Sequence, residues 1–316
     1  MSSRIPSPHV FALAGTVVLW ASAFPAIRVG IDGLGVAALS FLRIVIAALA
    51  LLLVAPLAKV RLPRRRDLPM ISLCGVTGVT AYQALLNWGE VRVAAGTASL
   101  LIAVAPVFSV LLGSLFLDER LSRTIVVGSA VALAGAALVS LAGGAGGFTV
   151  SALIVLAAAV VQGVYHFATK PLLRRYTGLE VAAYAMAAGA VFALPLLPAT
   201  WHAALHAPAG ALASAVYLGL LPSALGFVIW AYAVARLPLA ASTAALYLVP
   251  PVALLVSFVW LGEVPHPVEL LGGAVSVAGV VLINRRKRSR SPLGPSAENV
   301  SDATAGQAAA RPAPAR

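Results

Sequence analysis

Two stretches of the chain, residues 96–122 and 240–266, align with each other in a single register. In this register Pro106 falls on Pro250, and Glu119 falls on Glu263 at the end of each apolar run. The matching pairs also include Arg92 with Arg236, Gly128 with Gly272, and Gly135 with Gly279. Chance alignment of apolar sequence supplies Leu and Ala matches, but it does not readily supply proline, acid and glycine matches together. The sequence therefore predicts an internal duplication.

The composition places this duplicated chain in a membrane. Hydrophobic residues make up 61% of the 316 residues, charged residues make up 10%, and the mean hydropathy is +0.98. Apolar stretches of about 20 residues, the length that crosses a bilayer, recur along nearly the whole chain. We expect an all-α polytopic membrane protein with ten transmembrane helices, at residues 9–29, 34–56, 69–89, 95–117, 124–142, 151–170, 178–198, 210–234, 239–262 and 268–284.

Lysine and arginine lie almost entirely on one side of these expected spans. That side holds Arg4, Lys59, Arg61, Arg64, Arg65, Arg66, Arg120, Arg123, Lys170, Arg174, Arg175, Arg236, Arg285, Arg286, Lys287, Arg288, Arg290, Arg311 and Arg316. The opposite side holds Arg28 and Arg92. Because basic residues accumulate in cytoplasmic loops, both termini are expected to be cytoplasmic.

An odd number of spans in each half predicts that the second half is inverted relative to the first. The expected parts are a short cytoplasmic N-terminus (1–8), a first five-helix repeat (9–142), a second, inverted repeat (151–284) and a disordered basic cytoplasmic tail (285–316). In this arrangement Arg28 of the first span matches Lys170 of the sixth. Inverted repeats are typical of transporters that work by alternating access to a site near the bilayer midplane.

Several segments carry a family resemblance: LWASAFPAIRVG (19–30), the second span with Arg43, APVFSVLLGSLFLDERLS (105–122) and LVPPVALLVSFVWLGEV (248–264). They resemble EamA-type members of the drug/metabolite transporter superfamily, and the resemblance covers about residues 9–284. It implies a ten-helix carrier of the bacterial inner membrane, often an exporter of amino acids or other small metabolites. The chain departs from the family pattern at Pro250-Pro251 and at Pro265.

Polar and aromatic residues inside the spans are candidates to line a substrate cavity, because such residues usually face the bundle interior. Gln83 and Asn87 share a helix face, as do Gln162 and His166. The candidates together predict an aromatic, weakly polar cavity suited to an apolar or zwitterionic solute: Trp20, Phe24, Tyr82, Gln83, Asn87, Trp88, Gln162, Tyr165, His166, Trp230, Thr243 and Tyr247. Each has an alternative role in hydrogen bonding between helices, or, for Trp88, in an interfacial aromatic belt.

Pro106 and Pro250 lie in the middle of spans, where a missing N–H interrupts the helix. They predict a hinge or a cavity-lining break in the fourth and ninth helices, with a static kink as the alternative. Arg43 is a charge well inside the second span. It is a candidate to bind a substrate carboxylate, to hold the bundle through backbone carbonyls, or to snorkel to the interface; we favour a structural or gating role.

The acidic residues lie at span ends, in loops or in the tail. They are Asp32, Asp67, Asp118, Asp302, Glu90, Glu119, Glu180, Glu263, Glu269 and Glu298. Proton-coupled carriers commonly use a carboxylate at mid-depth, and none is expected here. We therefore expect transport to be uncoupled or to use His166 as the titrating group.

Small residues mark two further helices as packing faces. They are Gly128, Ala132 and Ala136 in one helix and Gly272, Ser276 and Gly279 in the other. The pattern fits contacts within one chain or between two, so a monomer and a homodimer both remain open.

The sequence shows no signature of an enzyme, a metal site or a cofactor. His202 and His206 are expected in a short external loop without a third ligand, and Cys74, the single cysteine, lies within a span. Since the basic residues sit in loops, we expect no nucleic-acid partner; the expected partners are a small-molecule substrate and the lipid bilayer. The predicted function is secondary transport of a small metabolite by alternating access, with export favoured. An uptake permease, a channel and a non-transporting scaffold are the alternatives.

Overall fold

The computed structural model describes residues 8–117, 122–142 and 150–285. These residues are helical or lie in short connections, and no strand occurs among them. The contacts below lie within residues 1–283, one of two compact units; of the other unit, residues 284–316, the structure describes the end of the last helix. The expected N-terminal segment before Pro8, the residues Asp118, Glu119 and Arg120, and the expected tail beyond Arg285 lie outside the described residues.

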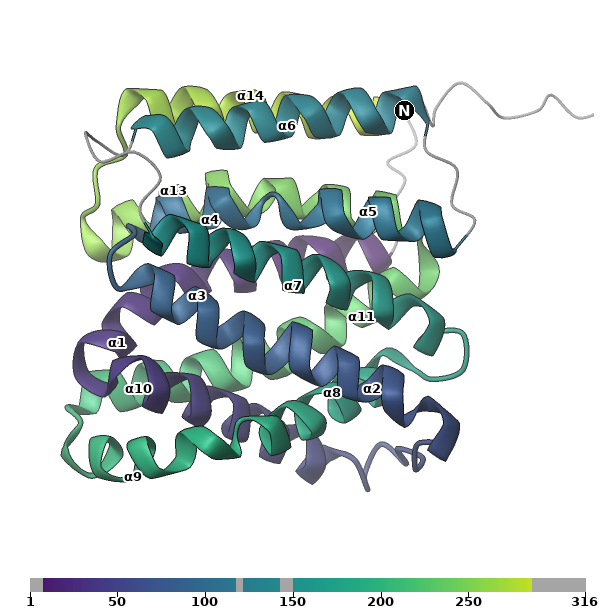
Figure 1. The fold of residues 1–316 in the computed structure, drawn as a ribbon, viewed down its shortest axis with the longest axis vertical. Coiled ribbons are helices and arrows are strands. Elements are labelled where there is room, and N and C mark those ends of the chain that lie inside the picture. Colours follow the sequence, from purple (N-terminus) through teal and green to yellow (C-terminus); the bar gives the residue numbers. More distant parts are fainter. Residues whose placement is uncertain (1–7, 118–121, 143–149, 286–316) are drawn as a thin grey trace, which may run out of the picture. The chain divides into compact units, whose positions relative to one another are not determined.

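The helices follow one another along the whole described chain (Figure 1). In chain order they are α1 (Pro8–Val54), α2 (Leu68–Cys74), α3 (Tyr82–Glu90), α4 (Ala95–Ile102), α5 (Ala105–Phe116), α6 (Arg123–Ala142), α7 (Val150–Leu172), α8 (Gly178–Phe192), α9 (Leu197–His206), α10 (Ala209–Leu218), α11 (Gly226–Arg236), α12 (Leu239–Ala244), α13 (Val249–Leu261) and α14 (Pro267–Arg285). Short 3₁₀ turns occur at Arg65–Asp67, Leu194–Leu196 and Ala245–Leu248, and π-helical segments at Gly75–Ala81 and Gly219–Leu225.

The 47 residues of α1 form two helices that meet at a kink. The kink lies at Gly35, whose φ of 72° is in the left-handed region that glycine adopts without a steric penalty. Figure 1 shows α1 reversing its direction. The two helices correspond to the expected spans 9–29 and 34–56, but helical backbone replaces the short connection that the sequence suggested.

Within the part of the chain that the structure describes, six helical stretches are long and apolar enough to cross a membrane: Pro8–Val54, Arg65–Glu90, Ala95–Phe116, Val150–Leu172, Ala209–Arg236 and Leu239–Leu261. Helix α8 and the stretch Leu194–His206, bent by 46° at the break between them, count as a seventh if the pair is a single span. His202 and His206 lie in α9 rather than in the expected loop. The chain is a multi-pass, all-helical membrane protein.

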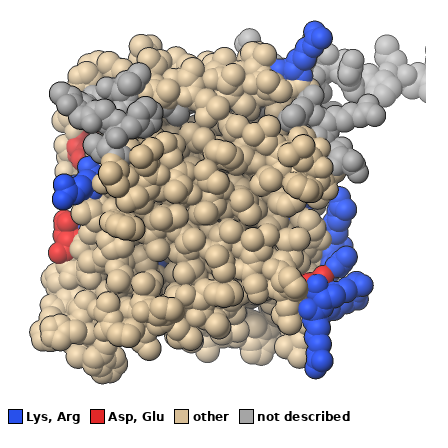
Figure 2. All heavy atoms as spheres, viewed as in Figure 1, with Lys and Arg blue, Asp and Glu red and all other residues tan. Residues whose placement is uncertain are grey.

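Charged side chains gather at two opposite edges of the face shown in Figure 2, with a broad band almost free of them in between. Near the start of α8, Arg61 binds the Glu180 carboxylate through Nε at 2.7 Å and through Nη2 at 2.8 Å. This hydrogen bonding raises the pKa of Arg61 above its ordinary value. Beside it, Asp67 pairs with Arg175 and accepts a hydrogen bond of 2.8 Å from the Tyr176 hydroxyl. These contacts join the segment after α1 to the turn between α7 and α8.

The expected small-residue faces meet inside one chain, where α6 and α14 lie side by side (Figure 1). A Cβ added at Gly279 would lie 2.6 Å from the Gly128 carbonyl oxygen and 2.8 Å from the Ala132 nitrogen. Any larger residue at position 279 would push the two backbones apart. The prediction of a packing face is therefore confirmed for these three residues, as a contact within the chain.

A second close approach joins α8 to α11 and gives a stability test. A Cβ at Gly178 would lie 2.7 Å from the Tyr232 backbone nitrogen and 3.0 Å from the Ala231 carbonyl carbon. Backbone atoms cannot rotate away, so Gly178→Ala is expected to cost about 1–3 kcal/mol in the free energy of unfolding. Thermal unfolding of the purified protein in detergent measures the change.

Gly210→Ala is the matched control, because a Cβ there meets no atom within 4 Å. We expect its unfolding temperature to equal or slightly exceed that of the wild type, since alanine is the better helix former. If both variants unfold at the same temperature as the wild type, the close α8–α11 contact is wrong.

Candidate functional site

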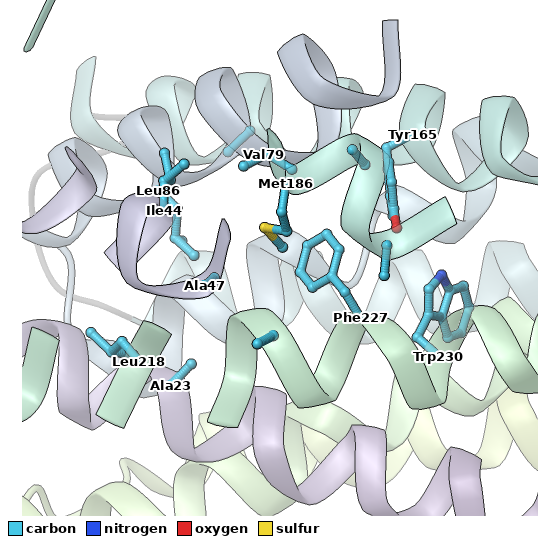
Figure 3. Close-up of a cluster of buried hydrophobic side chains, with 14 of the residues drawn as sticks. Ala23, Ile44, Ala47, Val79, Leu86, Tyr165, Met186, Leu218, Phe227 and Trp230 are labelled. Carbon is cyan, nitrogen blue, oxygen red and sulfur yellow. The ribbon is translucent and has the colours of Figure 1, made fainter. Parts of the chain in front are cut away.

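An aromatic cluster around Trp20 occupies the interior, where α1, α7 and α11 meet. The ring centroid of Trp20 lies 5.5 Å from Phe227, 5.5 Å from Trp230, and 6.2 Å from His166, with which it stacks at an interplanar angle of 9°. Figure 3 shows Phe227 and Trp230 projecting from one helix, with Tyr165 reaching towards them. The Tyr165 and Phe227 centroids are 5.3 Å apart. Residues distant in sequence thus build a single aromatic surface.

Local backbone features hold the Trp20 indole in place. Its Nε1 donates a hydrogen bond of 3.1 Å to the Pro222 carbonyl oxygen in the π-helical segment before α11. Gly226 leaves room for the ring, since a Cβ there would lie 2.8 Å from Trp20 Nε1. The indole N–H is therefore hydrogen-bonded to the backbone, and Trp20 contacts its other neighbours through the faces of its ring.

A cavity of about 30 Å³ lies on one side of this cluster. Six of the residues that the sequence singled out line it: Trp20, Phe24, Tyr82, Pro106, Gln162 and His166. Gln162 and His166 are 2% and 1% exposed, and their side chains approach each other at 3.4 Å. The other lining residues, which sequence reasoning missed, are Ser99, Ile102, Ala103, Ala105, Leu246 and Val249.

A second cavity, of about 20 Å³, shares Trp20, Phe24 and Tyr82 with the first. Arg43 and Gln83 line it from α1 and α3, together with the remaining residues Ala23, Leu86, Pro222 and Phe227. Each cavity has room for a water molecule or two. Neither cavity, as it stands in this structure, has room for a solute as large as an amino acid.

Helix breaks contribute directly to the first cavity. Pro106 lies in the first turn of α5, and Ala103 and Val104 separate that helix from α4. Pro250 lies in the first turn of α13, after the 3₁₀ turn Ala245–Leu248. At both sites the missing proline N–H falls where a helix leaves it unpaired anyway. The expected breaks in both spans are present; whether they act as hinges stays a prediction.

The remaining sequence-predicted residues lie outside both cavities. Tyr165 and Trp230 are fully buried in the aromatic cluster. Thr243 and Tyr247 are buried near the α12–α13 break, where Thr243 Oγ1 donates to the Leu239 carbonyl oxygen at 2.9 Å. Trp88 is 58% exposed, a placement that fits the alternative role at the membrane interface.

The charged neighbourhood of Arg43 differs from what the sequence suggested. Arg43 is 4% exposed, so it does not snorkel. Its Nη1 and Nη2 lie 3.4 Å from Asn87 Oδ1 and 3.4 Å from Ser223 Oγ. Glu90 does end α3 as expected, but it is fully buried, and neither carboxylate oxygen has a hydrogen-bond partner within the described structure. Glu90 thus lies at the end of a span, as the sequence predicted, but it is buried there rather than exposed.

Comparison with known proteins identifies the family. Residues 7–141 and 149–285 each match the EamA-like transporter family. The chain belongs to this family. It is 68% identical over 284 residues to the "Probable terminal-alkyne amino-acid exporter" of Streptantibioticus cattleyicolor, covering 90% of this chain and 96% of that protein. It is also 39% identical to the "Uncharacterized transporter YdfC" of Bacillus subtilis, over 83% of this chain and 86% of that one.

More distant relatives agree with this assignment. The "Pseudopaline exporter CntI" of Pseudomonas aeruginosa is 28% identical over 157 residues, covering 50% of this chain and 55% of that protein. A crystal structure at 22% identity superposes with a TM-score of 0.68, covering 90% of this chain and 100% of the other, which supports the fold. An EamA-like transporter with these relatives is a membrane transporter rather than an enzyme.

The single cysteine makes access to the cavities measurable. Cys74 is fully buried, so we expect it to resist N-ethylmaleimide in the folded protein. In a Cys74→Ala background, Ser99→Cys places a thiol at the first cavity, and we expect it to react as the transporter opens and closes. Ser257→Cys is the control, since Ser257 is equally buried, at 1% exposure, and lines neither cavity. Equal labelling of the two thiols, followed by mass spectrometry, would contradict a cavity that opens to solvent.

Proposed function

We propose that this EamA-like transporter exports small, apolar α-amino acids, of which those with a terminal alkyne side chain are the best candidates. The observation that carries the proposal is the 68% identity to a probable terminal-alkyne amino-acid exporter, which extends over 90% of this chain. The site agrees with such a substrate. A slender apolar side chain suits the faces of Trp20 and Phe24, and the charged groups of an amino acid suit the buried polar atoms at either side.

We also propose the finer architecture of ten spans in two inverted five-helix repeats, with both termini cytoplasmic. The kink in α1 supports two spans there, and the shorter apolar helices α6 and α14 supply the fifth and the tenth. A π-helical segment interrupts the third span of each proposed repeat, and a break precedes the matching prolines of the fourth span. The basic clusters in the loops set the orientation, which makes the cytoplasmic membrane of a bacterial cell the proposed location.

A further correspondence between the proposed repeats involves Arg28 and Lys170, which match in the alignment of the two halves. Arg28 donates to the carbonyl of Glu90, the last residue of α3, at 2.6 Å. Lys170 donates to the Val234 carbonyl in the last turn of α11 at 2.7 Å, and also to the carbonyl of Leu237. A basic residue of each proposed first span therefore binds the end of the third. Duplication of the two halves accounts for this pairing.

The proposal is tested by efflux from cells that produce the protein and are loaded with labelled L-propargylglycine, a simple terminal-alkyne amino acid. We expect wild-type cells to lose the label faster than cells without the protein. Trp20→Ala removes one of the three rings that line both cavities and is expected to lower the rate about tenfold, the effect of some 1.4 kcal/mol. Trp201→Ala, at a residue 70% exposed on α9, is the matched control and should keep the wild-type rate.

The outcomes separate the alternatives. Faster accumulation of the label in producing cells would show uptake and contradict export. Unchanged flux with propargylglycine and with other small apolar amino acids, at verified expression in the membrane, would contradict transport of this substrate class. Equal efflux in the Trp20 variant and the wild type would exclude the aromatic cluster as the site.

A further inference from the structure

Arg43 is a buried cation whose hydrogen-bonding capacity is largely unused. Its two contacts, to Asn87 Oδ1 and Ser223 Oγ, are both 3.4 Å long, beyond the usual 2.7–3.2 Å of such bonds. Its Nε has no partner within the described structure. Arg61 shows what a satisfied guanidinium looks like in the same chain, with two carboxylate contacts of 2.7 and 2.8 Å.

No carboxylate forms an ion pair with Arg43 among the described residues. Arg61 pairs with Glu180 and Arg175 pairs with Asp67, whereas Arg43 forms no such pair among the described residues. A buried cation is costly unless it is paired and hydrogen-bonded. Glu90 is buried on the same helix as Asn87 and its charge acts on Arg43 through space, but the two side chains form no ion pair in the described structure. The geometry leaves a guanidinium able to accept an anion.

Gln83 adds a second unused group at the same cavity. It is fully buried, and neither its Oε1 nor its Nε2 has a hydrogen-bond partner within the described residues. Gln83 and Arg43 both line the smaller cavity, from α3 and α1. An amide and a guanidinium facing one small cavity together offer several donors, the set that binds a carboxylate well.

We propose that Arg43 binds the α-carboxylate of the transported amino acid, with the Gln83 amide as a second donor. The inference rests on the proposed function, because it takes an amino acid as the substrate. The two cavities share Trp20, Phe24 and Tyr82, so a substrate anchored at Arg43 extends its side chain past these rings towards Pro106. Arg43 is then a specificity-determining residue for the carboxylate rather than a purely structural one.

The test compares L-propargylglycine with two analogues that lack the carboxylate, its carboxamide and but-3-yn-1-amine, as competitors in proteoliposomes of the full chain. Wild type is expected to prefer the amino acid over both analogues. In Arg43→Gln we expect the KM for the amino acid to rise about tenfold or more, as loss of a charged hydrogen bond predicts. The preference over the carboxamide should disappear in that variant, and Arg43→Lys should restore part of it.

A second variant covers the case in which Arg43→Gln does not fold. Gln83→Glu places a carboxylate beside Arg43, where it should occupy the proposed anion site from within the chain. We expect transport to fall about tenfold or more while the unfolding temperature stays equal or rises. A structural Arg43 would predict the same thermal effect with transport retained. Gln83→Leu, which removes the amide without adding charge, is the control and should weaken transport less.

The outcomes distinguish this inference from the function on which it rests. If wild-type vesicles carry propargylglycine but Arg43→Gln keeps the full preference over the carboxamide, the Arg43 assignment is overturned and the exporter stands. Normal transport by a stable Gln83→Glu variant overturns it as well. If wild-type vesicles transport no amino acid, both the proposed function and this inference are contradicted.

Discussion

The ends of membrane helices set the strictest condition on this fold, because the last carbonyls of a helix have no partner within the helix and lipid supplies none. Two basic residues meet this condition from neighbouring helices. Arg28 donates to the carbonyl of Glu90 at the end of α3, and Lys170 to the carbonyl of Val234 near the end of α11. Each bond fixes one helix against the end of another. The same positive charges that influence topology therefore also hold the bundle together.

A related demand explains why the irregular backbone lies close to the cavities. Segments that depart from α-helix are tolerated at membrane depth where protein or a cavity surrounds them. Ala103 lies between α4 and α5, and Leu246 lies in the 3₁₀ turn before α13; both line the first cavity. Pro222, inside a π-helical segment, lines the second cavity and accepts the Trp20 hydrogen bond. The interruptions in three helices thus shape the site.

Much of the helical layout could be predicted from sequence, because long apolar runs and mid-span prolines have few other interpretations in a membrane. Helix-face reasoning also placed Gln162 and His166 together, and the structure has both at one cavity. It could not place Trp88, since periodicity shows which residues share a face but not which face a neighbouring helix covers. Asn87, one residue earlier, points to Arg43, while Trp88 is exposed.

Glu90 shows a second limit of sequence reasoning. The sequence places it at the end of a span, where a carboxylate would ordinarily meet water, and the structure buries it completely. The cause is tertiary, because α1 and α7 pack against α3 and cover its end. The kink at Gly35 shows the same limit. A glycine between two apolar runs suggests a short loop, but the structure is helical on both sides of Gly35, and this depends on tertiary contacts that the sequence does not reveal.

The distribution of polar atoms around the aromatic cluster bears on how a small zwitterion is handled. Trp20 donates its N–H to Pro222, so it lines both cavities through its apolar ring. The polar side chains differ between the two cavities, with Arg43 and Gln83 at one and Gln162 and His166 at the other. An aromatic ring stabilises an apolar side chain but not a charge, so the charged end of a solute needs the polar groups of one cavity or the other. Discrimination between side chains then depends on the shape of the aromatic surface, and discrimination between charged and neutral solutes depends on these polar groups.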